Sequence, residues 1–118
     1  REFSVRFKDT LRYVSDHGIE ITLVQSIPEP GYPVPEYLIR SAKLGKQIEP
    51  FTFDSASQLK IAKYSEYLTK VIEPQKIFCN IELVCETTAH GVPLYFDSNH
   101  LTKTGASMLL KDLTFRTL

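Results

Sequence analysis

The chain has 118 residues, of which 42% are apolar and 24% charged, and its 14 basic residues balance 14 acidic ones. Such values are typical of one small soluble globular domain with a single core. The charge balance argues against a nucleic-acid partner, and no apolar run in the sequence is long enough to cross a bilayer.

The N-terminal quarter has the pattern of a helix followed by a strand. Apolar residues recur at helical spacing and predict an amphipathic helix over about residues 2–16, with Gly18 ending it. Residues 19–25 are rich in β-branched side chains, which predicts a strand covered on both faces. This αβ order favours a parallel sheet. The apolar positions of the helix are Phe3, Phe7, Leu11 and Val14.

A proline-rich loop follows over residues 26–35, because Pro28, Pro30, Pro33 and Pro35 exclude both a helix and a central strand there. Loops that leave the carboxyl ends of parallel strands border the active-site crevice of open α/β sheets. We therefore expect this loop to form a pocket wall.

The middle of the chain predicts two helices. A short helix over residues 36–44 follows the last proline and is stopped by Gly45. A longer helix, capped by Asp54 or Ser55, is expected to carry a buried stripe. That stripe comprises Ile61, Tyr64, Leu68 and Val71 or Ile72.

The C-terminal third predicts strand-like pieces at 76–79 and 81–85, a loop at 87–93 and a final helix. Thr102 is expected to cap this helix, which should run to about Phe115. Its expected buried side comprises Ala106, Leu109, Leu110 and Leu113.

Just before the last helix, Asp97 precedes His100 by three residues. A carboxylate at this spacing can accept a hydrogen bond from one imidazole nitrogen and leave the other free to take a proton from a hydroxyl nucleophile. The alternative is structural, because Asp-Ser-Asn is an ordinary turn sequence and a histidine in a polar loop usually faces solvent.

Cys79 and Cys85 are the two cysteines of the chain. They fit equally well as two reduced, buried thiols or as a disulfide that closes a small loop. A metal site is the poorest interpretation, because two cysteines with no suitably spaced histidine do not make a zinc site. We therefore expect no metal and no cofactor.

Three segments, in order, resemble the C-terminal part of an SGNH (GDSL-like) domain of the kind attached to bacterial membrane-bound O-acyltransferases. The first is Ile21-Thr22-Leu23-Val24-Gln25-Ser26-Ile27-Pro28-Glu29-Pro30, the second is the cysteine pair, and the third is Leu94-Tyr95-Phe96-Asp97-Ser98-Asn99-His100-Leu101-Thr102 with Gly105-Ala106. The resemblance implies a three-layer αβα, flavodoxin-like fold with a parallel sheet. Residues 1–118 would form only the C-terminal portion of one such domain.

The same resemblance implies His100 as general base and Asp97 as its orienting partner. In that family a serine nucleophile comes from an N-terminal Gly-Asp-Ser block, and this sequence contains no Gly-Asp-Ser. The implied activity is the transfer of an acyl group, most often acetyl, to a hydroxyl of a surface polysaccharide such as lipopolysaccharide O-antigen. The alternatives are a non-catalytic glycan-binding domain and an esterase or deacetylase of the same fold.

Partners and location follow from the same resemblance. The acyl donor would reach the glycan acceptor through an N-terminal membrane-embedded region, and the domain itself would be soluble at the periplasmic face of the inner membrane. An oxidising periplasm favours a disulfide between Cys79 and Cys85. The chain does not begin with Met, which suggests a fragment, and we expect this fragment alone to be inactive because it lacks the nucleophile.

Overall fold

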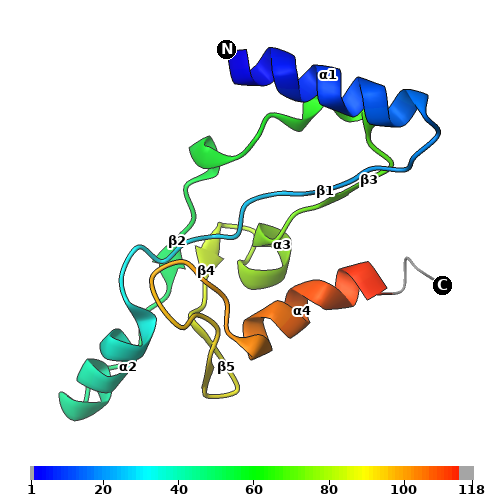
Figure 1. The fold of residues 1–118 in the computed structure, drawn as a ribbon. Helices are drawn as coiled ribbons and strands as arrows, with labels where there is room; N and C mark the ends of the chain where they lie inside the picture. The colour runs from blue at the N-terminus through cyan, green and yellow to red at the C-terminus, as the bar shows by residue number, and fades with distance from the viewer. Residues whose placement is uncertain (1, 115–118) are drawn as a thin grey trace.

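The computed structural model describes residues 2–114 and shows a mixed α/β arrangement (Figure 1). The helices are α1 (Glu2–Asp16), α2 (Val34–Lys43), α3 (Gln75–Phe78) and α4 (Lys103–Thr114). The strands are β1 (Thr22–Val24), β2 (Phe51–Thr52), β3 (Lys70–Ile72), β4 (Val84–Cys85), β5 (Thr88–Ala89) and β6 (Val92–Pro93). Single 3-10 turns are η1 (Ser55–Ser57), η2 (Ile61–Lys63) and η3 (Ser65–Tyr67).

The strands form small sheets of two strands each within residues 2–114. β1 pairs in parallel with β3, with Leu23 opposite Val71, whereas β2 pairs with β4 and β5 with β6 in antiparallel fashion. The parallel pair confirms the expected direction of the first strand. The layers of helices on both sides of a larger sheet, which the resemblance implies, are not formed by these residues.

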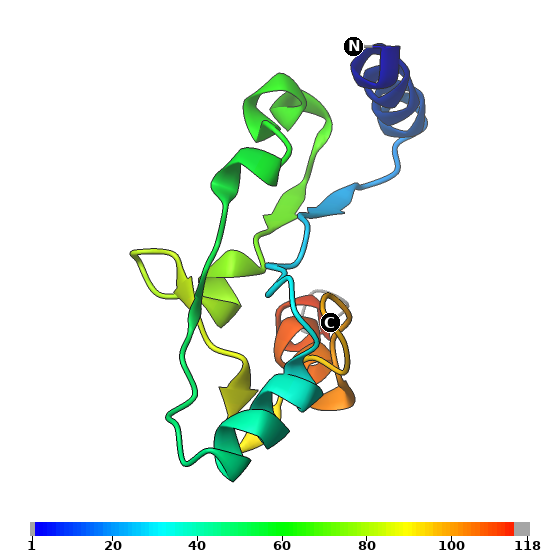
Figure 2. The same ribbon diagram turned by 90° about the vertical axis from the view of Figure 1, so that its left-hand side faces the viewer.

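Strand β1 is shorter and more exposed than the sequence predicts. Residues 19–25 were expected to be covered on both faces, yet the strand spans only Thr22–Val24, and the side chain of Val24 is 42% exposed. The reason is that, within residues 2–114, β1 pairs with β3 alone and has no second strand beside it (Figure 2).

Helix α1 packs on the 3-10 turns rather than on a sheet. Leu11 is buried, and the Phe7 ring meets the Tyr64 ring edge-on, with 5.1 Å between centroids. Phe3, which the periodicity places on the buried stripe, is instead exposed and stacks on Phe7. This part of the prediction is wrong, because Phe3 stacks on a neighbouring ring of its own helix and stays open to solvent.

The predicted helix after Asp54 is also wrong. The Asp54 side chain does accept a hydrogen bond from the Ala56 N–H, but the turn it caps is η1, and the chain continues through η2 and η3 into strand β3. The β-branched pair Val71–Ile72 gains more from pairing with β1 than from a helix. Tyr64 and Ile72, from the predicted stripe, are nevertheless buried.

Two further segments exchange their predicted types. Of residues 76–79, expected as a strand, 76–78 belong to the helical turn α3, and Cys79 is extended and bridged to Cys85. Only Val84–Cys85 of the predicted 81–85 strand is in strand β4. The predicted loop at 87–93 is the β5–β6 hairpin. His90 and Gly91 both have positive φ, 53° and 78°, as a tight hairpin turn of the primed type requires.

Helices α2 and α4 agree better with the sequence. α2 begins at Val34, with Pro35 in its first turn, and ends before Gly45, whose φ is 64°. α4 follows Thr102 as predicted. Leu109 packs on the core, but Leu110 is exposed. The predicted end at Phe115 and the side chain of Leu113 lie outside the described residues.

The main core lies at the end of the molecule that carries α2, the hairpins and α4. Its buried apolar residues are Val34, Phe51, Phe53, Phe78, Cys85, Leu94 and Tyr95. The Tyr95 ring meets Phe51 edge-on at 6.1 Å between centroids. Within residues 2–114, no helix has both the length and the apolar character that a membrane crossing requires.

Candidate active site

The loop between β6 and α4 is closed at its base by backbone pairing. Tyr95 and Leu101 form an isolated antiparallel bridge, and the Phe96 N–H donates to the His100 carbonyl at 3.0 Å. The Thr102 N–H donates to the Leu94 carbonyl at 2.9 Å. Residues 97–99 therefore sit at the tip of a short, cross-braced loop immediately before a helix.

The Asp97 carboxylate serves both the turn and the histidine. Its Oδ1 accepts hydrogen bonds from the backbone N–H groups of Asn99 and His100, at 2.9 and 2.7 Å. Its Oδ2 lies 2.7 Å from Nδ1 of the His100 ring. The two interpretations of the sequence, a turn residue and an imidazole partner, are thus both realised in one side chain.

This geometry selects one state of the imidazole. An ionised carboxylate only accepts hydrogen bonds, so Nδ1 of His100 must carry the proton in this contact. In the neutral ring Nε2 is then the unprotonated nitrogen, and Nε2 has no hydrogen-bond partner among residues 2–114. Such a nitrogen can accept a proton from a hydroxyl group.

The hydrogen bonds also keep Asp97 ionised. The Asn99 N–H, followed by the N–H and the imidazole of His100, lowers the pKa of the Asp97 carboxyl below its ordinary value. The pair is nevertheless open to solvent, because the side chains of His100 and Asp97 are 66% and 41% exposed. Anything that binds to this surface can reach both residues.

The loop is fastened to the segment that leaves the carboxyl end of β1. The N–H groups of Gly31 and Val34 donate to the carbonyls of Ser98 and Asp97, at 3.3 and 3.4 Å. Beneath them, the Tyr95 hydroxyl donates to the Pro28 carbonyl at 2.6 Å. Burial raises the pKa of the Tyr95 phenol, so it remains a donor. The carboxylate–histidine pair therefore lies beside the proline-rich segment that follows β1.

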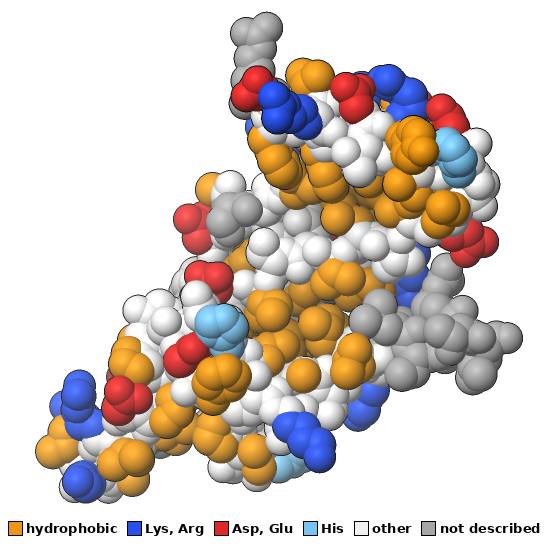
Figure 3. All heavy atoms as spheres, viewed as in Figure 1, with side chains coloured by type: hydrophobic (Ala, Val, Ile, Leu, Met, Phe, Trp, Pro, Cys, Tyr) orange, Lys and Arg blue, Asp and Glu red, His pale blue; other side chains and the backbone are white. Residues whose placement is uncertain are grey.

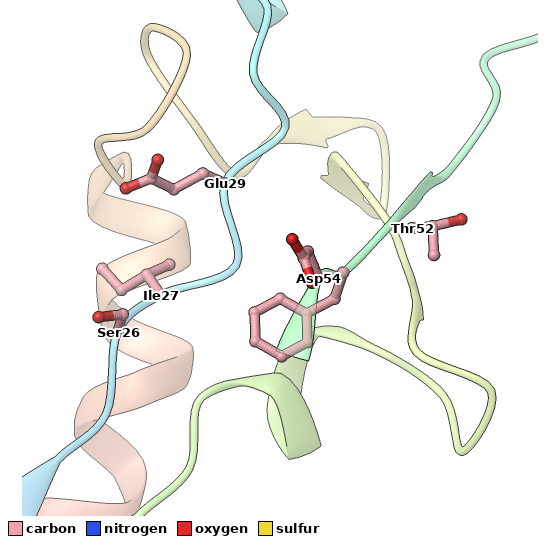
Figure 4. A pocket seen from close by; sticks show the side chains of 6 residues that line it. Ser26, Ile27, Glu29, Thr52 and Asp54 are labelled. Carbon is pink, nitrogen blue, oxygen red and sulfur yellow. The ribbon is translucent and has the colours of Figure 1, made fainter. Parts of the chain in front are cut away.

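A cleft of about 270 Å³ borders the same segment. Its lining residues are Ser26, Ile27, Glu29, Thr52, Phe53 and Asp54. In Figure 4 the Asp54 carboxylate points toward the 26–29 segment, whereas the Glu29 carboxylate points the other way, toward the loop before α4. The expectation that the proline-rich loop forms a pocket wall is confirmed, although the carboxylates do not converge on one point.

The first turn of α4 fixes the other end of the loop. The Thr102 hydroxyl accepts from the Gly105 N–H at 3.2 Å and donates to the Pro93 carbonyl at 2.7 Å. A Cβ at Gly105 would lie 2.5 Å from the Leu94 carbonyl oxygen. Glycine is therefore required for the close approach of helix and loop.

Cys79 and Cys85 form a disulfide. The two residues also face each other in an antiparallel bridge, and Cys85 is fully buried in the core. The bond confirms the pairing that the resemblance implied, and it indicates an oxidising compartment. Of the alternatives left open by the residues alone, the reduced thiols are excluded.

Two contributors to the site were missed in the sequence. Tyr95 anchors the loop to Pro28, and the Phe96 ring stacks on the His100 ring. No pattern in the sequence signals either contact, because both depend on how the chain pairs across the loop and against Pro28.

The family comparison agrees with these features. Residues 1–114 match the family described as SGNH domain (fused to AT3 domains), so the chain belongs to the family of SGNH domains that are fused to AT3 acyltransferase domains. Neither the curated proteins nor the solved structures include a significant match to the chain. The fold implied by the family is that of the SGNH hydrolases.

Proposed function

We propose that this chain supplies the base and its orienting carboxylate to an SGNH enzyme that transfers an acyl group, acetyl in the first instance, to a hydroxyl of a bacterial surface polysaccharide. The observation that carries the proposal is the 2.7 Å contact between Asp97 Oδ2 and His100 Nδ1, which leaves Nε2 available. Family membership supports the acyl-transfer class.

In the proposed mechanism, Nε2 of His100 takes the proton from a serine hydroxyl as that oxygen attacks the carbonyl carbon of the acyl donor. The imidazolium then returns the proton to the leaving group, and an acyl-serine remains. In the second half, Nε2 removes the proton from the acceptor sugar hydroxyl as its oxygen attacks the acyl-serine. The imidazolium then gives this proton to the departing serine oxygen, which restores the serine hydroxyl and the neutral histidine. Asp97 holds Nδ1–H and stabilises the imidazolium in both halves.

The serine is proposed to come from a Gly-Asp-Ser block outside residues 1–118, in the same SGNH domain. Two observations support this. The chain contains no Gly-Asp-Ser, and the pair is exposed on a loop held against the proline-rich segment that follows β1. We accordingly propose that residues 1–118 are the C-terminal portion of one SGNH domain with a three-layer αβα fold, and that they are inactive alone.

The proposed location is the periplasmic face of the bacterial inner membrane. The disulfide between Cys79 and Cys85 supports an oxidising compartment, and fusion to AT3 acyltransferase domains supports an acyl donor delivered through a membrane-embedded part of the same protein.

The test compares histidine variants of the full-length protein. His100→Gln should reduce acylation of the polysaccharide by about three to four orders of magnitude, because the proton acceptor is lost. His90→Gln is the matched control, since His90 is exposed in the β5–β6 turn and should be dispensable. The readout is acyl content of the polysaccharide by mass spectrometry.

The alternatives appear as different outcomes of this experiment. Full acylation by the His100→Gln protein, with the polysaccharide still bound, would favour a non-catalytic glycan-binding domain. Release of free acid from an acylated glycan without any transfer, lost in His100→Gln, would identify an esterase that uses water in place of the sugar hydroxyl.

A further inference from the structure

Phe96 is an exposed aromatic residue whose ring faces the histidine of the candidate site. Its side chain is 59% exposed. Its ring lies nearly parallel to the His100 imidazole, with an interplanar angle of 15° and 5.6 Å between ring centroids. Aromatic rings at this separation attract each other when stacked with an offset. Although Phe96 is exposed, its ring therefore makes a specific contact with His100.

The backbone holds the two rings in register. The Phe96 N–H donates to the His100 carbonyl at 3.0 Å. The bridge between the next pair of residues toward the base of the loop, Tyr95 and Leu101, closes the loop. Phe96 and His100 are consequently opposite each other across the loop. Stacking does not depend on the long-range fold, because both partners lie within one turn of chain.

The imidazole is thus restrained in two independent ways. The Asp97 carboxylate holds the ring edge at Nδ1, and the Phe96 ring stacks against the imidazole with an offset. A hydrogen bond at one edge leaves the ring free to tilt about that contact, whereas a stacked neighbour opposes the tilt. Together the two contacts fix the direction in which Nε2 points.

We propose that Phe96 is a positioning residue that aims Nε2 of His100 at the reacting hydroxyl and stabilises the imidazolium formed during proton transfer. This inference rests on the proposed function of His100 as the base. A cation over an aromatic face at an exposed site gains the equivalent of about two- to fivefold in an equilibrium constant, and misalignment of a reacting group adds a further loss in rate.

The experiment uses the full-length protein with isotopically labelled histidines and two substitutions. Phe96→Leu keeps apolar bulk but removes the ring face, and Phe96→Tyr keeps the face. In Phe96→Leu the ring-proton signals of His100 should shift as the ring-current contribution disappears, and kcat for acyl transfer should fall about five- to fiftyfold with KM nearly unchanged. Phe96→Tyr should restore both readouts.

A second aromatic–histidine pair supplies the control. The ring centroids of Tyr13, on α1, and His17, which directly follows that helix, lie 4.3 Å apart, and Nδ1 of His17 contacts the Tyr13 carbonyl rather than a carboxylate. Tyr13→Leu should change the signals of His17 and leave kcat unchanged. The His100 signals are assigned from their loss in His100→Gln.

The outcomes separate the two proposals. Unchanged His100 signals in Phe96→Leu, or shifted signals with full kcat, would overturn the role of Phe96 while leaving His100 as the base. Full activity of His100→Gln would instead overturn the proposed function itself, and the positioning role with it.

Discussion

At the scale of single residues, Asp97 performs two tasks that one substitution can separate. Asparagine at this position still offers an Oδ1 acceptor to the Asn99 and His100 N–H groups, but the atom facing Nδ1 becomes the amide nitrogen, which donates hydrogen bonds instead of accepting them. The turn should therefore persist while the imidazole loses its ionic partner and its preferred tautomer.

For Asp97→Asn we expect acyl transfer by the full-length protein to fall about 10³- to 10⁴-fold, with little change in thermal stability. Asp9→Asn is the control, because Asp9 forms an exposed ion pair with Arg12 on α1 and should leave activity unchanged. A fully active Asp97→Asn protein would reduce the carboxylate to a turn residue.

The pH dependence of this turn follows from the lowered pKa of Asp97. A carboxyl group with a lower pKa in the folded protein stabilises the fold above its ordinary value of 3.8, and that stabilisation is lost as the pH falls through the lowered value. The backbone amide signals of Asn99 and His100 should therefore titrate in one step below pH 3.8. In Asp97→Asn this step should be absent, and a step above 3.8 would contradict the hydrogen-bond assignment.

Local spacing made this pair predictable. The three-residue interval between Asp97 and His100 requires only one turn of chain to bring carboxylate and imidazole together, so no long-range contact had to be known. Phe96 was not predictable in the same way. Its ring stacks on His100 because the Tyr95–Leu101 bridge closes the loop, and no pattern in the sequence predicts this bridge.

At the scale of elements, helices ended by glycine or capped by threonine were predictable, and short strands were not. Gly45 ends α2 and Thr102 caps the start of α4, and both do so through backbone groups close to them in the sequence. These two helix ends could therefore be predicted from local sequence. β3 exists because β1 offers a partner, and residues 55–72 otherwise have acceptable helical periodicity. Tertiary pairing therefore decided the type of that segment.

The α4 start depends on one glycine. In Gly105→Ala the new Cβ would lie 2.5 Å from the Leu94 carbonyl oxygen, which itself accepts from the Thr102 N–H. Moving either group costs about 1–3 kcal/mol, which exceeds the gain of about 1 kcal/mol from replacing glycine by alanine in a helix.

We expect the midpoint of thermal unfolding, followed by circular dichroism, to fall by several degrees in Gly105→Ala. Ser107→Ala, at an exposed position of the same helix, isolates helix propensity and should leave the midpoint unchanged or slightly higher. An increase in the Gly105→Ala midpoint similar to that of the control would show that the Leu94 carbonyl moves aside without loss of stability.

At the scale of the whole molecule, the described chain is more extended than a compact domain. Its radius of gyration is 17.0 Å, against about 13.5 Å for a compact chain of this length. The views in Figures 1 and 2 show α1 and the 3-10 turns at one end and the core at the other. Figure 3 shows apolar side chains gathered beneath α1 and again on the same face between α1 and α4.

The parallel direction of β1 and β3 was predictable from the helix–strand order, but the size of the sheet was not. A sheet of two parallel strands is small for this architecture, since parallel sheets are normally buried on both faces. In the proposed SGNH domain, further strands would pair beside β1 and cover Val24 and the apolar side of α1. The open face is then a packing surface within one domain.

This proposal predicts a difference between the chain alone and the full-length protein. Residues 1–118 expressed alone should bind a hydrophobic fluorescent dye and self-associate, and amide exchange over residues 19–25 should be faster there than in the full-length protein, where added strands would protect β1. Val24→Thr keeps β-branching and should reduce dye binding by the isolated chain. Ile81→Thr is the control, because Ile81 is 98% exposed in the disulfide-closed loop and lies outside the sheet. Equal exchange rates over residues 19–25 in both proteins would mean that β1 ends the sheet, and that the serine reaches His100 from a separately folded unit.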